Sequence, residues 1–68
     1  MSGKQAILRV DATYDLTVKT GDAVRQGERL SHDPSKGTAS IAPMTGVIRS
    51  IRFDPDHHEF VIVIAGAQ

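Results

Sequence analysis

Apolar and polar residues alternate over short segments of this chain, which is the pattern of β-strands with one buried face. Leu8 and Val10 share one parity, and Arg9 and Asp11 have the other. The first segment is therefore predicted to bury its aliphatic side chains and to expose its charges. Residues 16–18 follow the same rule. No window of ten or more residues has apolar positions at helical spacing, so we predict strands and no helix of two turns or more.

Turn-forming residues separate these segments at short intervals. Glycine, proline and aspartate supply the backbone conformations that tight turns need. They cut the chain into pieces of about five to seven residues, which predicts an all-β domain of short strands. The predicted turns are Thr20-Gly21-Asp22, Gln26-Gly27-Glu28, residues 33–37, Pro43-Met44-Thr45-Gly46 and Asp54-Pro55-Asp56.

One segment breaks the alternation. Within residues 47–53, Ile48 and Ile51 cannot share a face of a regular strand, because side chains alternate with a period of two. A β-bulge near Arg49-Ser50 would return both to one face. The positions then predicted to be buried are Leu8, Val10, Leu16, Val18, Val24, Leu30, Ile51, Phe53, Ile62 and Ile64.

The last apolar segment, residues 60–64, is apolar at both parities. Such a strand is covered on both faces, or it lies at an edge that another molecule covers. A domain of this size has room for one core, so we expect Val61 or Val63 to lie near the surface. The two valines are predicted to belong to an exposed strand edge that pairs with a second copy of the chain or with a larger protein.

Composition limits the classes of function. The chain has 68 residues and no cysteine, which predicts one domain over residues 1–68 and excludes disulfide-stapled and cysteine-ligated metal modules. Eight basic and eight acidic residues give no net charge, so nucleic acid is not an expected partner. The longest apolar run is too short to insert into a membrane, and no signal-peptide core follows residues 1–4. A cytoplasmic location is the resulting expectation.

The two halves of the chain repeat weakly. Residues 14–18 and 49–53 can be superposed as strands followed by polar turns, with a period of about 35 residues. Two interlocked copies of such a unit would bury each other's apolar faces. The repeat predicts two small antiparallel sheets with pseudo-twofold symmetry.

Two ordered motifs resemble those of biotinyl and lipoyl carrier domains. Residues 18–30, VKTGDAVRQGERL, are similar to the V-x-x-G-D-x-V-x-x-G-x-x-L segment of that family. Residues 42–51, APMTGVIRSI, are similar to its A-P-x-x-G-x-V-x-x-I segment. The resemblance implies a barrel-sandwich hybrid fold.

A closer likeness is to the unmodified domain in the C subunits of Rnf-type electron-transport complexes. It rests on residues 45–51, on the polar loop 54–58 and on the apolar strand 60–64. The nucleotide-binding portion and the cysteine clusters of those subunits have no counterpart in this chain. The likeness therefore implies the fold and not electron transfer.

Lys36 is the modification site that the carrier resemblance implies. Carrier domains present their lysine on a hairpin, between two methionines or between an acidic residue and alanine, whereas Lys36 lies between Ser35 and Gly37. Biotin or lipoate on Lys36 is thus the alternative. The flanking residues favour an unmodified lysine in a solvated loop, with no cofactor.

Two other groups of polar residues have the composition of a chemical site. Residues 54–59 hold two histidines and three acidic residues that could bind zinc or nickel, but adjacent histidine side chains diverge on an extended segment. His32 beside Asp33 has the form of a base with its orienting carboxylate, but no serine or cysteine nucleophile can be placed beside it. Polar turns without metal or catalysis are the favoured interpretation.

Three classes of function follow from these observations. The leading one is a non-catalytic interaction or assembly module with a protein partner or a second copy of itself. The second is a carrier domain modified on Lys36, and the third is a metal- or substrate-binding accessory of an enzyme.

Overall fold

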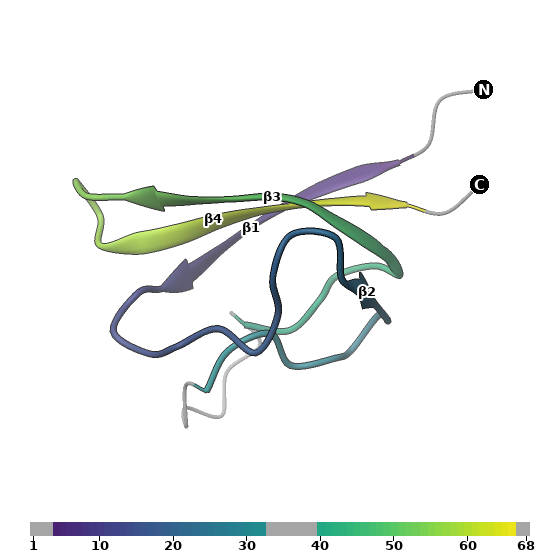
Figure 1. Cartoon of the computed structure of the whole chain (residues 1–68), viewed down its shortest axis with the longest axis horizontal. Coiled ribbons are helices and arrows are strands. Elements are labelled where there is room, and N and C mark those ends of the chain that lie inside the picture. The colour runs from purple at the N-terminus through teal and green to yellow at the C-terminus, as the bar shows by residue number, and fades with distance from the viewer. Residues whose placement is uncertain (1–3, 33–39, 67–68) are drawn as a thin grey trace.

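The computed structural model describes residues 4–32 and 40–66 of the chain and consists there of strands, bridges and turns (Figure 1). The strands are β1 (Gln5–Asp11), β2 (Ala23–Val24), β3 (Gly46–Asp54) and β4 (Glu59–Gly66). They form one antiparallel sheet in the order β1-β4-β3-β2. The all-β prediction is confirmed for the described residues, among which no helix occurs.

The described residues contain this one four-stranded sheet and no second one. The sheet is twisted and curled, and the described parts of the connections before and after β2, residues 12–22, 25–32 and 40–45, lie on its concave side (Figure 1). The prediction of two sheets is therefore not borne out for the described residues, and the part of the fold prediction that holds is the all-β class. What lies opposite the sheet is a layer of extended segments that meet at isolated bridges, between Leu16 and Ser31 and between Arg29 and Ile41.

Backbone hydrogen bonds hold this opposite layer together. The amide of Thr17 donates to the carbonyl of Leu30 at 2.9 Å, and the amide of Leu30 donates to the carbonyl of Ser40 at 2.8 Å. The amide of Ala42 returns a bond of 2.8 Å to the carbonyl of Glu28. Three chain segments far apart in sequence are thus paired side by side without forming a continuous ladder.

The core fills the space between the sheet and the opposite layer. Sheet residues supply its larger part, and the opposite layer contributes Leu30, which is fully buried. Packing of both layers on one apolar centre replaces the second hydrophobic face that a single curled sheet lacks. The buried apolar side chains are Val10, Val24, Leu30, Ala42, Ile48, Ile62 and Ile64.

Most of the predicted core is confirmed, and one member is wrong. Five of the ten predicted positions are buried, namely Val10, Val24, Leu30, Ile62 and Ile64, and four are half-buried against them, namely Leu8, Leu16, Val18 and Ile51.

The wrong member is Phe53, which is 52% exposed. It lies at the hairpin end of β3, opposite Phe60 in the register. Its ring has edge contacts with Phe60 and with His58, at centroid distances of 5.9 and 5.8 Å. The alternation puts Phe53 on the concave face, as predicted, but at an end of the sheet where burial is incomplete.

The predicted bulge in β3 is confirmed. Ile48 pairs with Ile64 and Ser50 pairs with Val63, so that Arg49 is the extra residue. Ile51 then pairs with Ile62. Because of the extra residue, both isoleucines of β3 face the core, as the sequence requires.

Two turns with the same construction flank β2. In residues 19–22 and 25–28, the third residue is a glycine with positive φ, 97° at Gly21 and 89° at Gly27. In each turn the amide of the fourth residue donates to the carbonyl of the first. The acidic side chain of that fourth residue, Asp22 or Glu28, accepts the amide of the first at 3.0 Å. This reciprocal bonding explains the repeated glycine-acid pair in the sequence.

The final strand does not lie at an edge. β4 pairs with β1 on one side and with β3 on the other, so the prediction that it presents a free edge is wrong. Its apolar residues at both parities fit a central strand. The even-numbered side chains face the core, and the odd-numbered ones are half-buried among the side chains of the neighbouring strands. The strand at the edge is β1.

Candidate interaction surface

Apolar side chains gather on the convex face of the sheet, away from the core. Ile7 pairs with Val63 in the register of β1 and β4, and Val47 pairs with Ala65 in that of β3 and β4. Ile7 is 69% exposed and Val47 is 43% exposed. We call the group formed by Ile7, Val47, Val61, Val63 and Ala65 the convex patch.

Strand alternation places the two predicted valines at the centre of this patch. Ile62 and Ile64 are buried, whereas Val61 and Val63 between them are half-buried. On this face Val61 and Val63 are bordered by the side chains of their cross-strand neighbours in β1 and β3. The structure thus puts Val61 and Val63 on a sheet face, where the sequence had predicted a strand edge.

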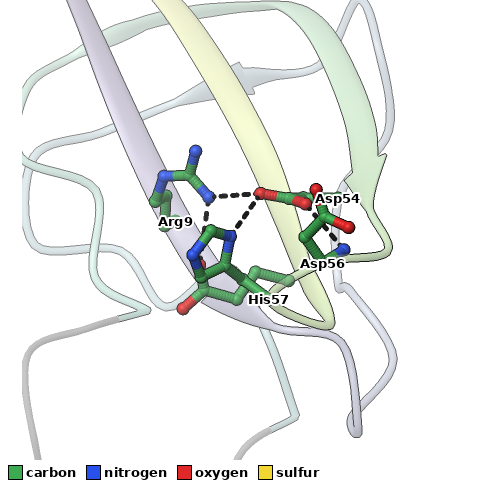
Figure 2. Close-up of polar contacts among 5 residues, drawn as sticks. Arg9, Asp54, Asp56 and His57 are labelled. Atoms are coloured by element: carbon green, nitrogen blue, oxygen red, sulfur yellow. Dashed lines mark hydrogen bonds and ion pairs between the residues drawn. The ribbon is translucent and has the colours of Figure 1, made fainter.

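A polar cluster borders the patch at the hairpin end of the sheet (Figure 2). The guanidinium of Arg9 donates through Nη1 to Oδ2 of Asp54 at 2.9 Å and to Oε1 of Glu59 at 3.1 Å. Nδ1 of His57 lies 2.9 Å from the same Oδ2 of Asp54. The other carboxylate oxygen of Asp54 accepts the amide of Asp56 at 3.0 Å.

These contacts set the charge state of the cluster. The hydrogen bond from Arg9, followed by that from His57, holds the pKa of Asp54 well below its usual range. Asp54 in turn, with Glu59 second, raises the pKa of Arg9. The cluster is solvent-accessible, so its ion pairs contribute modestly to stability.

The carboxylate of Asp54 is the hydrogen-bond acceptor at the centre of this cluster. Both oxygens of Asp54 already accept hydrogen bonds from protein groups. Within the part of the chain that the structure describes, no group of three or more His, Asp or Glu side chains is placed to hold a metal ion. Asp54 thus links Arg9 of β1 to His57 of the hairpin between β3 and β4.

The remaining predicted sites fall outside the described residues. Lys36 with its neighbours Ser35 and Gly37 lies in the undescribed range 33–39, as does Asp33, the proposed partner of His32. His32 itself is exposed, and its amide donates to the carbonyl of Asp15 at 2.9 Å.

The sequence analysis missed the Arg9 cluster and the exposed position of Ile7 within a patch. The alternation already put Arg9 and Ile7 on the outward face of the first strand. Their neighbours could not be named, because Asp54 and Glu59 follow Arg9 by 45 and 50 residues and only the strand order brings them together.

No protein-family model matches the chain, and neither a curated protein nor a solved structure is similar enough to count as a match. Among residues 4–32 and 40–66, no helix is long and apolar enough to cross a membrane.

Proposed function

We propose that this chain is a non-catalytic barrel-sandwich module that binds a protein partner through its convex patch. The observation that carries the proposal is the exposure of Ile7 and Val47 beside the half-buried Val61 and Val63. A folded monomer gains nothing from large aliphatic side chains on a solvated sheet face, whereas a protein contact buries them.

Two features of the fold support the barrel-sandwich assignment. The motif glycines Gly21 and Gly27 occupy turns that need positive φ. The segments around Leu16, Arg29 and Ile41 are paired opposite the sheet. Both features agree with two interlocked β layers, the arrangement that the resemblance implies.

The partner is expected to present an apolar surface with polar groups at its border. The convex patch is apolar at its centre, and the next row towards the hairpin carries Arg9 and Arg52 on either side of Val61. Arg9 is already paired with carboxylates of its own chain. An apolar partner surface with acidic or amide groups opposite Arg52 would complement this face.

The alternative is a carrier domain modified on Lys36. One observation favours it, namely the pairing of Arg29 with Ile41 and of Leu30 with Ser40 on either side of residues 33–39. Lys36 therefore belongs to the connection between two antiparallel segments. The absence of the flanking residues that ligases read makes this the second candidate.

The test places a photo-reactive side chain at position 63 of the full chain in its host cells, so that a bound partner is cross-linked there. Binding of the purified partner to the chain is then measured. Val63→Lys should weaken that binding by about tenfold or more, because one buried aliphatic contact is worth about 1.5 kcal/mol or above. Gln26→Lys adds the same charge in the turn 25–28, outside the patch, and should leave the affinity unchanged. An equal loss of affinity in both variants would overturn the proposed surface, and so would saturable binding that Val63→Lys does not weaken.

A further inference from the structure

The edge strand β1 has a row of backbone groups that point away from the sheet. The amide of Ala12 donates to the carbonyl of His58 at 2.9 Å, and the amide of Gly66 donates to the carbonyl of Lys4 at 2.6 Å. The backbone amides and carbonyls of the even-numbered residues in this segment therefore point toward β4. Because direction alternates along a strand, the amides and carbonyls of the odd-numbered residues in β1 face outward. No segment in residues 4–32 or 40–66 pairs with that side.

Two devices that often protect an edge strand, proline and a β-bulge, are absent from β1. Its seven residues contain no proline, and their register with β4 runs without a shift from Gln5 and Ala65 to Asp11 and Glu59. Its one basic residue, Arg9, is turned over the sheet to Asp54 and Glu59. Ile7 is one of the odd-numbered residues whose backbone groups point outward, and its side chain is 69% exposed. A regular edge strand without proline or bulge and with an exposed aliphatic residue is a template for strand pairing.

The opposite edge of the sheet does not share these properties. It is formed by β2, which has two residues, and an edge of that length offers too few backbone groups to hold another strand. Pairing through the sheet edge is therefore directed to β1.

We propose that two copies of this chain pair antiparallel through β1, about a twofold axis at Ile7, so that their sheets become one continuous sheet. This inference rests on the proposed assembly function and adds a second copy of the chain as the partner of the β1 edge. In this register each Ile7 lies opposite the other, and each Gln5 lies opposite Arg9 of the other copy.

Side-chain chemistry selects this axis over its neighbours. An axis at Arg9 would oppose two guanidinium groups, which destabilises a strand pair. An axis at Leu8 would set each Ile7 against Arg9 and leave the most exposed aliphatic side chain beside a cation. The axis at Ile7 opposes no like charges.

The pairing also extends the convex patch. Ile7 is the neighbour of Val63 across β1 and β4, so an Ile7 pair would join the patches of the two copies into one apolar strip across the dimer. A domain of 68 residues would in this way present a contact area that neither copy offers alone.

Amide hydrogen exchange of the intact chain tests the edge directly. The outward amides of Gln5, Ile7 and Arg9 should exchange fast at micromolar concentration and become at least tenfold slower at millimolar concentration. The inward amides of Leu8 and Val10 are the internal control and should be protected at both. A monomer in sedimentation at millimolar concentration, with the outward amides still exchanging fast, would overturn the dimer.

A cysteine variant tests the axis, since the chain has no cysteine of its own. A hydrogen-bonded antiparallel pair has its Cα atoms about 5.5 Å apart, within disulfide range, so Ile7→Cys should form a disulfide-linked dimer under mild oxidation. Gln5→Cys lies on the same strand and parity but not opposite itself, and should cross-link at least tenfold more slowly. Equal rates for the two variants would overturn the axis at Ile7.

Charge variants separate this inference from the proposed function. Ile7→Lys should weaken the dimer at least tenfold, whereas Gln26→Lys, in the turn 25–28 and away from β1, should leave its dissociation constant unchanged. A monomeric chain that still loses its partner through Val63→Lys would overturn the dimer and leave the proposed function standing. A chain that dimerises but has no partner whose binding depends on Val63 would overturn the proposed function and leave the dimer standing.

Discussion

Gly46 is a position of β3 where a side chain would meet the backbone of β4. A Cβ atom at Gly46 would overlap the backbone carbonyl of Ala65, which cannot move without disturbing the ladder. At Gly66, on the paired strand, a Cβ would meet the methyl group of Met44 at 2.6 Å and the carbonyl of Lys4 at 3.2 Å. The first obstacle is backbone and the second is mainly the end of a flexible side chain.

Gly46→Ala should therefore destabilise the protein by about 1–3 kcal/mol, the range found when extra atoms are forced into a packed site. Gly66→Ala is the matched control and should cost less, because Met44 can change rotamer. Urea denaturation of both variants measures the difference. A larger loss for Gly66→Ala would mean that Met44, and not the ladder, is the rigid element.

Asp54 links stability to pH through its bonds with Arg9 and His57. Its pKa in the folded protein is lowered, so its contribution is fully present above the unfolded pKa, about 4. The contribution is lost as the pH falls below that value. Asp54→Asn should accordingly show a smaller drop in Tm between pH 6 and pH 2 than the unsubstituted chain.

Asp56→Asn is the control for this experiment, because it removes a carboxylate from the same hairpin without touching Arg9. It should keep the acid-dependent loss of the unsubstituted chain. If Asp54→Asn shows the same drop as the control, the Arg9 cluster does not contribute to stability in solution.

At the scale of the strand, β4 separates two roles by parity. Ile62 is fully buried and Val61 is half-buried on the other face. Ile62→Ala should cost about 2–5 kcal/mol, a large part of the stability of so small a domain. Val61→Ala should cost less than about 1 kcal/mol, as surface substitutions do. Chemical denaturation decides, and equal costs would mean that the convex face is covered in the isolated chain.

The bulge in β3 allows a deletion to be tolerated. Arg49 is the unpaired residue between Ile48 and Ser50, so its removal leaves Ile48 and Ile51 facing the core in a regular ladder. Deletion of Arg52 shifts Phe53 to the other parity and breaks the hairpin register. Nuclear magnetic resonance spectra should show a folded chain for the first deletion. The second deletion should lower the free energy of unfolding by at least about 2 kcal/mol. Unfolding of both would show that the bend itself is required.

At the scale of the whole molecule, the carrier and assembly hypotheses predict different masses for the protein. The chain produced together with biotin and lipoate ligases should have its unmodified mass, because Ser35 and Gly37 replace the residues that those ligases read. Intact-mass spectrometry makes the measurement, and Lys36→Arg is the control that abolishes any specific addition. A gain matching either group, lost in the control, would establish the carrier function.

The convex patch and the β1 edge together describe how so small a domain could work. Its concave side is occupied by the core and the opposite layer, so recognition is left to the convex face and the edge. Both surfaces meet at Ile7. A single substitution there should affect self-association without disturbing the core, since Ile7 is largely solvent-exposed.

The sequence alone determined the features that depend on neighbours along the chain. The strand class, the turns around Gly21 and Gly27 and the bulge at Arg49 all follow from local alternation and local backbone geometry. Most of the core follows too, because parity decides which face of a strand is apolar. Such features need no knowledge of which strands pair.

The strand order was decided only in the tertiary structure. Nothing in residues 60–64 reveals that β4 pairs on both sides, or that β1 is left at the edge, since pairing partners are far apart in sequence and alternation is the same for central and edge strands. For the same reason the position of Phe53 at an exposed end of the sheet and the meeting of Arg9 with Asp54 could not be read from the chain. Periodicity gives the face of each side chain, and only the packing of distant strands gives its neighbours.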